Sequence, residues 1–186
     1  MLELSMHILD IAENSVTAGA HRVTISVNED TDHNTLTIDI SDDGRGMDDA
    51  FLEKALDPFV TTKPGKRTGM GLSLFSQAAR QCGGTFHIDT SPGKGTHIHA
   101  TFLLDHPDRQ PLGDMIETLT VLVVGQPDID LTYSYIHCGA GFTWDSDCIA
   151  CELVDLPRYH PDVAAFVRTS LENKYTALLQ HAAQSK

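Results

Sequence analysis

A cluster of positive charge lies in an otherwise acidic chain, directly ahead of two closely spaced glycines. Three of the chain's 13 Lys and Arg residues fall within five positions of one another: Lys63, Lys66 and Arg67. Gly69 and Gly71 follow, and apolar residues from Leu72 onward recur at helical spacing. The start of a helix presents unpaired N–H groups and a positive dipole end. The pattern predicts a mobile basic loop, residues 60–68, that leads into a phosphate-binding helix N-terminus.

Two other sets of polar residues have a spacing suited to chemistry. Asp10 and Asn14 are four residues apart in a segment of helical periodicity, so their side chains project from one face. Asp42 follows a strand-like alternation and is itself followed by Gly44 and Gly46, which permit a tight loop. An acidic side chain is thereby fixed beside a loop that can approach a flat ligand closely.

The elements that must position these residues follow from hydrophobic periodicity. Ser5 is a candidate cap for the first helix, and Asp48 or Asp49 for the second. The predicted helices span 5–18, 50–55 and 72–81, and the predicted strands span 23–27, 36–40, 85–89 and 95–104. This order predicts an α+β fold, a two-layer sandwich whose mixed sheet is covered by helices on one face.

A polar stretch with two prolines, DHPDRQPLG, suits a domain boundary. We therefore predict a first domain over 1–106, a linker over 107–113 and a small α+β module over 114–186. Within this module the apolar patterns predict strands at 119–124, 129–136 and 142–144, and a C-terminal helix from Pro161.

Composition limits the classes of function. The net charge of −13 repels nucleic acid and anionic lipid, so we expect neither as a partner. The longest apolar run is too short to span a bilayer and no signal peptide is evident, so we expect a cytoplasmic protein. Four cysteines in such a chain do not indicate a disulfide framework, and free thiols are expected.

Four separated segments together resemble the ATP-binding domain of the GHKL superfamily, which includes DNA gyrase, Hsp90-type chaperones, sensor histidine kinases and MutL. ILDIAENSVTAGA resembles the N box and DDGRGM the G1 box. DPFVTTKPGKRTGMGLSL resembles the lid and G2 box of nitrogen-regulator-type sensor kinases, and SPGKGTHIHATF resembles the closing G3 segment. The resemblance covers about residues 1–104 and implies a Bergerat-type fold.

The resemblance implies Mg·ATP as the ligand and assigns roles to individual residues. Asn14 would coordinate Mg²⁺ through its amide oxygen, the kind of ligand that this hard cation prefers. Asp42 would accept a hydrogen bond from the adenine amino group, with Thr96 assisting. The other positions that would contact the nucleotide are Gly44, Gly46, Met47, Lys63, Arg67, Thr68, Gly69, Met70, Gly71 and Leu72.

Asp10 departs from the pattern of the superfamily. Members that hydrolyse ATP commonly carry Glu at this position, four residues before the Mg²⁺ asparagine. The shorter side chain leaves two roles open for Asp10: a catalytic base, or a structural contact to Mg²⁺-bound water. Glu13 is a second candidate base, although its place on the helix turns it away from Asn14.

The histidine pattern also departs from that of sensor kinases, whose phosphoacceptor histidine precedes the ATP domain and is commonly followed by an acidic residue. Few residues precede the N box here, and none of the ten histidines is followed by Asp or Glu. Two hypotheses result: a kinase or ATPase of histidine-kinase type that acts in signalling on a separate protein, or an ATP-gated regulatory binding module without phosphoryl transfer. A protein partner is expected in both, and a homodimer is compatible with either.

Three other groups were weighed as sites. His97 and His99 share one face of a strand, for which we expect a solvated surface rather than a metal site. Cys148 and Cys151, with nearby Cys138 and His137, form only half of a zinc motif, which favours buried, inert thiols over a metal site. Tyr133, Tyr135 and Trp144 predict a small core rather than a partner surface.

Overall fold

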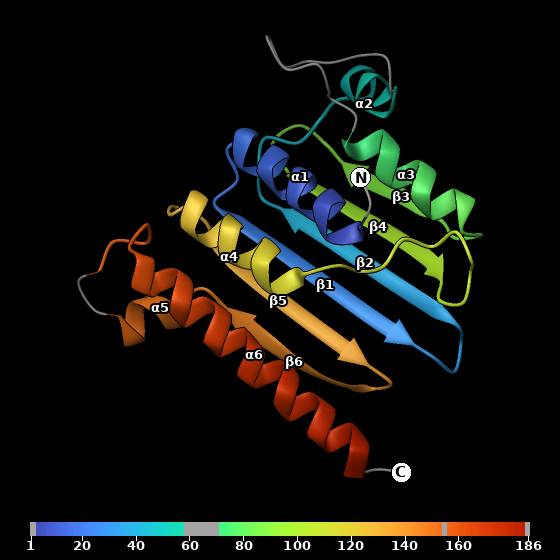
Figure 1. Ribbon diagram of the computed structural model, residues 1–186. Coiled ribbons are helices and arrows are strands. Elements are labelled where there is room, and N and C mark those ends of the chain that lie inside the picture. The colour runs from blue at the N-terminus through green and yellow to red at the C-terminus, as the bar shows by residue number, and fades with distance from the viewer. Residues whose placement is uncertain (1–2, 58–70, 154–155, 185–186) are drawn as a thin grey trace.

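The computed structural model describes residues 3–57, 71–153 and 156–184, with side chains described up to residue 180. Six strands form one mixed sheet in the order β3-β4-β2-β1-β5-β6 (Figure 1). The strands are β1 Arg22–Asp30, β2 Thr35–Asp42, β3 Phe86–Thr90, β4 Thr96–Leu103, β5 Asp130–His137 and β6 Ala140–Asp145. All neighbouring pairs are antiparallel except β1 and β5, which are parallel.

Helices cover one face of this sheet. They are α1 Leu4–Thr17, α2 Asp49–Leu56, α3 Gly71–Gln81, α4 Met115–Gly125, α5 Asp147–Glu152 and α6 Pro161–Gln184. Figure 1 shows α3, α1, α4 and α6 side by side along the sheet, while α2 lies beyond its end. Every second residue of β1 and β2 is buried beneath the helices, as the alternation in the sequence indicates. The predicted two-layer α+β sandwich is confirmed.

The start of α1 corrects one prediction. Ser5 is not the cap but lies inside the first turn, 2% exposed. The N-cap residue is Glu3, which makes no side-chain cap hydrogen bond. The amides of Leu4 and Ser5 instead donate to the carbonyls of Pro111 and Leu112, at 3.0 and 2.8 Å. Distant backbone therefore satisfies the helix terminus, a solution that local sequence does not reveal.

The prediction of a strand at residues 119–124 was wrong, because the segment is helical. Residues 119–124 form no strand but belong to the helix α4. The segment is almost uniformly apolar, and a buried helix and a buried strand then have the same pattern. The local signal for a helix was Asp114, whose side chain accepts a hydrogen bond from the Glu117 amide and caps α4.

The C-terminal segment extends the sheet instead of forming a separate one. β5 runs beside β1 with Val23 paired to Leu131, and β6 follows β5 at the edge. One hydrophobic core contains Val23 and Leu131 together with Val167 of α6. Tyr133 and Trp144 are buried within it, as predicted. The strands at 129–136 and 142–144 and the helix from Pro161 are confirmed, whereas the division into domains stays a prediction.

His7 of α1 is a buried titratable group at the centre of the helical layer. Its side chain is 2% exposed and packs against Phe75, with ring centroids 5.6 Å apart. Its Nε2 lies 3.1 Å from Oε1 of Gln110. Burial lowers the pKa of His7, although the Gln110 hydrogen bond and the charge of Asp10 oppose the shift.

This burial predicts a loss of stability in mild acid. The unfolded chain takes up a proton near the ordinary histidine pKa of about 6.5, which the folded chain resists. The free energy of unfolding should therefore fall as the pH falls through about 6.5 toward the lowered pKa. Urea unfolding between about pH 7.5 and 5.5 should show a weaker pH dependence for His7→Leu than for the unaltered chain.

The exposed His33 provides a control of opposite sign. Hydrogen bonding to Asp30 raises the pKa of His33, so its contribution is present at low pH and is lost as the pH rises through the raised pKa. His33→Asn should therefore steepen the loss of stability in acid. Equal pH profiles for His7→Leu and the unaltered chain would contradict the role given to His7.

Candidate functional site

Asp42 is the last residue of β2 and lies at one end of the sheet, on the helix-covered side. Its carboxylate accepts two hydrogen bonds from different elements. Oδ2 receives the hydroxyl of Ser15 of α1 at 2.6 Å, and Oδ1 receives the amide of Gly44 at 2.9 Å. Ser15 is 4% exposed, whereas Asp42 is only partly buried. The carboxylate is thus fixed in orientation and keeps lone pairs for a ligand that donates hydrogen.

The loop after Asp42 is held tightly against the end of α1 and the start of β1. The side chain of Asp43 accepts the amides of His21 and Arg22, both at 2.8 Å. The Arg22 hydrogen bond, reinforced by that from His21, lowers the pKa of Asp43. The Arg45 amide donates to the carbonyl of Ala18 at 3.1 Å. These contacts fix the loop at a set distance from α1.

The glycines of this loop are required by close packing. A Cβ on Gly44 would lie 3.0 Å from Oδ1 of Asp42 and 3.2 Å from Cβ of Ala18. Gly46 has a φ of +63°, and a Cβ there would overlap the carbonyl oxygen of Ser91. Both predicted glycine positions therefore lie where the loop passes against backbone or against the carboxylate.

Threonines from β3 and β4 complete this end of the sheet. Thr96 is the cross-strand partner of Asp42, so the two predicted residues are brought together. Thr90 accepts the amide of Met47 at 3.0 Å, donates to the carbonyl of Gly95 at 2.9 Å, and lies 3.2 Å from the Thr96 hydroxyl. A single hydroxyl group thereby links the glycine loop to the turn between β3 and β4.

The predicted residues of α1 lie beside the start of α3. Asn14 is exposed, and its side chain makes no hydrogen bond within the described ranges. Asp10, one turn earlier, is partly buried, and a Cβ on Gly71 would lie 3.1 Å from its Oδ2. Gly71 is the first residue of α3, so Asp10 is next to a helix N-terminus. Leu72 follows and is buried in the core.

Some of the predicted site cannot be placed. Lys63, Arg67, Thr68, Gly69 and Met70 lie outside the described residues, as does the whole loop predicted at 60–68.

Sequence reasoning also missed two residues that the structure brings to the site. Ser15 had a detectable signal, because it is a polar residue on the buried face of an amphipathic helix. Thr90 had none, since its partners come from the folded arrangement.

The histidine pair shares one carboxylate partner, and the cysteines differ in their exposure. His97 Nε2 and His99 Nδ1 lie 3.2 and 2.8 Å from the same Oδ1 of Asp39. Cys148 is partly buried, which raises the pKa of its thiol. Cys138 and Cys151 are exposed, so the prediction of buried thiols was wrong for these two. Among the residues that the structure describes, no three His, Cys, Asp or Glu side chains are grouped so that they could hold a metal ion.

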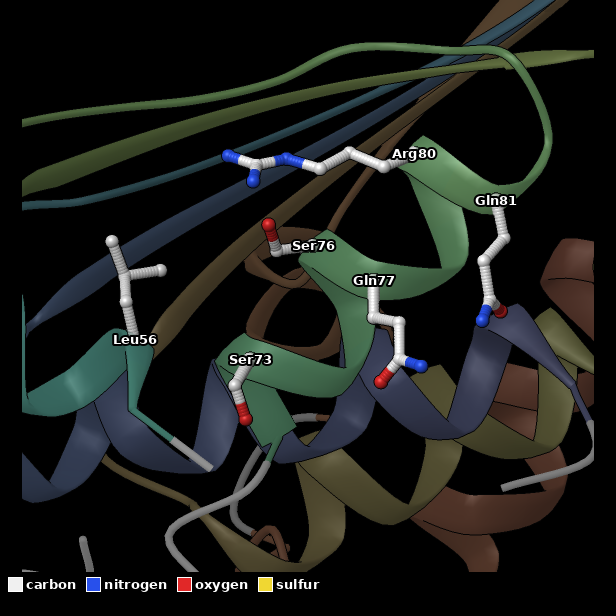
Figure 2. A pocket seen from close by; sticks show the side chains of 6 residues that line it. All are labelled: Leu56, Ser73, Ser76, Gln77, Arg80 and Gln81. Atoms are coloured by element: carbon white, nitrogen blue, oxygen red, sulfur yellow. The ribbon is translucent and has the colours of Figure 1, made fainter. Parts of the chain in front are cut away.

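A shallow hollow of about 490 Å³ lies between α2 and the surface of α3. Figure 2 shows Leu56 of α2 facing the α3 residues Ser76 and Arg80 across it. The remaining lining residues are Ser73, Gln77 and Gln81. None of these belongs to the predicted nucleotide contacts, and the carboxylate of Asp42 is not part of the hollow.

None of the helices in the described ranges has the length and apolarity needed to cross a bilayer.

Comparison with known proteins identifies relatives of this chain. Residues 2–106 match the family described as histidine kinase-, DNA gyrase B- and HSP90-like ATPase. Sporulation kinase A of Bacillus subtilis is 27% identical over 100 residues, which cover 54% of this chain and 16% of the kinase. The nitrogen regulation protein NtrY of Azorhizobium caulinodans is 32% identical over 94 residues, which cover 50% of this chain and 12% of NtrY. The chain thus spans less than a fifth of either relative.

Among solved structures, the MutL ATPase domain of Aquifex aeolicus, complexed with ADP, aligns over 76% of this chain and 62% of that one, with 15% identity and a TM-score of 0.48. The family match covers more than half of the 186 residues and contains the glycine loop, Asp42 and the helix that carries Asn14. This chain therefore belongs to the histidine kinase-, DNA gyrase B- and HSP90-like ATPase family and contains its ATP-binding domain.

Proposed function

We propose that the chain binds Mg·ATP where α1, the end of β2 and the start of α3 meet, and that it transfers or hydrolyses the γ-phosphate in a regulatory or signalling reaction on a separate protein. The observation that carries this proposal is the Asp42 carboxylate, held by Ser15 and Gly44 with Thr96 alongside. A fixed hydrogen-bond acceptor beside a close-packed glycine loop is suited to a flat base that carries an amino group.

The adenine ring would be recognised through its 6-amino group. Within the described structure, Ser15 donates to one oxygen of Asp42 and the Gly44 amide donates to the other. An ionised carboxylate can only accept hydrogen bonds, so a bound ligand must supply a donor. Adenine presents a donor at this position, whereas guanine presents the acceptor O6. The site would therefore favour adenine, because the O6 acceptor of guanine would face the acceptor oxygens of the carboxylate.

The phosphates would lie toward Asn14 and the start of α3. Asn14 presents an exposed amide that has no partner among the residues described in the structure, and this neutral oxygen ligand fits a hard cation. Bound Mg²⁺ would neutralise charge on the phosphates. Gly71 places the N–H groups of the first turn of α3 beside Asp10. The pocket would then act chiefly by positioning and charge neutralisation.

Asp10 would accept the proton of the attacking hydroxyl or water. Its position one turn before Asn14 and next to Gly71 supports this role, because the carboxylate would lie close to the proposed metal ligand and to the start of α3. Incubation with γ-labelled ATP, Mg²⁺ and cell extract tests this role, with phosphate release and protein labelling as readouts. Asp10→Asn should abolish both while ATP binding is retained.

The second candidate is an ATP-gated binding module that does not transfer phosphate. It is favoured by the shorter carboxylate at position 10 and by the absence of any histidine followed by an acidic residue in the sequence. Tight ATP binding with neither phosphate release nor labelling would support this candidate and rule out the first.

Replacing Asn14 by alanine should remove the contribution of Mg²⁺ to ATP affinity. We expect the affinity for Mg·ATP to fall by about 10–100-fold, because the metal loses a protein ligand. The affinity for ATP in EDTA should remain that of the unaltered chain. Isothermal titration calorimetry with and without Mg²⁺ measures both quantities.

Glu13→Gln on the same helix is the matched control, since Glu13 is turned away from Asn14 and should not alter either affinity. An Asn14→Ala chain that still responds fully to Mg²⁺ would contradict the assignment of Asn14 as the metal ligand.

A further inference from the structure

We propose that Ser15 is a positioning residue that sets the preference of the site for adenine over 6-oxopurines by holding the Asp42 carboxylate. This inference rests on the proposed function, because it assigns Asp42 to the nucleobase. It adds a residue of α1 that need not contact the nucleotide itself.

The hydroxyl of Ser15 has two acceptors within reach but only one proton to donate. Oδ2 of Asp42 is 2.6 Å away and the carbonyl of Ile11 is 3.2 Å away. A hydrogen bond to an ionised carboxylate is shorter and stronger than one to a neutral carbonyl. Ser15 therefore donates to Asp42, across 27 positions in the sequence, and joins α1 to the end of β2.

The two oxygens of Asp42 are held from different directions. Ser15 binds Oδ2 from the helix, and the Gly44 amide binds Oδ1 from the glycine loop. Together they prevent rotation of the carboxylate. Within the described structure Oδ2 has no second donor, so loss of the Ser15 hydroxyl would leave the carboxylate free to turn.

Such rotation of the carboxylate would reduce discrimination at the base. A carboxylate fixed as an acceptor suits the 6-amino group of adenine and is repelled by the 6-oxo group of hypoxanthine or guanine. A carboxylate that turns away loses this contrast. The bond to Ser15 should therefore influence the ratio of affinities for two purines more than the affinity for triphosphates in general.

The placement of Ser15 supports this specific role for the hydroxyl. Ser15 is 4% exposed and lies on the buried side of α1, on the same face as Ile8, Ile11 and Ala12. If the position only required a small buried side chain, alanine would be sufficient, and alanine also has a higher helix propensity. A purely structural serine would make Ser15→Ala neutral or equally harmful to the binding of every nucleotide.

The test compares ATP with inosine triphosphate, which carries an oxo group at position 6 and no amino group at position 2. Calorimetry in Mg²⁺ is applied to the full chain and to the Ser15→Ala and Thr17→Ala variants. Ser15→Ala should weaken ATP binding by about tenfold and change inosine triphosphate binding by less than about twofold, so the selectivity ratio falls. The Thr17 hydroxyl donates to the Glu13 carbonyl at 2.8 Å, away from Asp42, and its variant should keep both affinities.

Ser15→Cys provides a second variant if alanine impairs folding, since it nearly preserves volume but offers only a weak donor. It should also lower the selectivity ratio, while circular dichroism shows a folded chain. An unchanged ratio in the folded variants would overturn the role of Ser15 and leave the proposed function intact. Failure of the unaltered chain to bind ATP would instead overturn the proposed function, and this inference with it.

Discussion

An Asp42→Asn chain is expected to bind Mg·ATP at least about 100-fold more weakly than the unaltered chain, because it loses charge-assisted hydrogen bonds worth roughly 1.5–3 kcal/mol each. Ser15 and Gly44 each donate to a separate oxygen of Asp42. Asparagine has one carbonyl oxygen and one NH₂ group, so one of the two donors, or the adenine amino group, would face another donor. The neutral amide also attracts the amino group less than a carboxylate does.

Asp39→Asn is the matched control for this change. Asp39 belongs to the same strand but lies on the opposite face, where its carboxylate contacts His97 and His99. Its replacement should leave ATP affinity within about twofold, well below the loss expected from one charge-assisted hydrogen bond. Calorimetric titration of both variants, with circular dichroism to verify folding, makes the comparison. Normal ATP binding by the Asp42→Asn chain would refute the placement of adenine at the end of β2.

Replacing Gly95 by alanine should cost roughly 2–5 kcal/mol of folding stability, the sum of strain at positive φ and steric overlap. Gly95 has a φ of +77°, and a Cβ there would overlap the carbonyl oxygen of Asp42 and lie 3.0 Å from Cα of Asp43. Both neighbours are backbone atoms and cannot move away as a flexible side chain can. The turn and the end of β2 must therefore separate.

Gly93 in the same turn provides a control that isolates the steric part. Its φ of +78° is nearly identical, but a Cβ would have open space around it. Gly93→Ala should lose only the conformational cost of about 1–2 kcal/mol. Urea unfolding measures both variants, and equal losses would show that contact with the end of β2 is not the reason for glycine at position 95.

The sequence predicted well those elements whose pattern is local. The alternation of Val23, Ile25 and Val27 indicated a strand with one buried face, and the buried strand β1 has this form. The helical spacing from Val163 to Leu178 indicated α6 for the same reason. The position of Asp42 at the end of β2, directly before the glycine loop, also follows from a local signal, because a strand-like alternation ends there at a pair of glycines.

The remaining features depend on contacts between distant residues. Uniform hydrophobicity concealed the helical nature of α4, since neither period is visible when almost every position is apolar. Hydrogen bonds from Ser15 to Asp42 and from Met47 to Thr90 join residues 27 and 43 positions apart. No local rule specifies such partners. The parallel register of β5 against β1 likewise has no local signal in either strand.

During synthesis, the strand β1 is made long before one of its two neighbours in the sheet. β1 ends at Asp30, whereas its parallel partner β5 begins at Asp130. Until that later stretch leaves the ribosome, one side of β1 has no β5 to pair with, and an open strand edge is a template for association with other nascent chains. Translation speed and chaperone supply should therefore affect the yield of correctly folded protein more strongly than they would if both neighbours of β1 were made early.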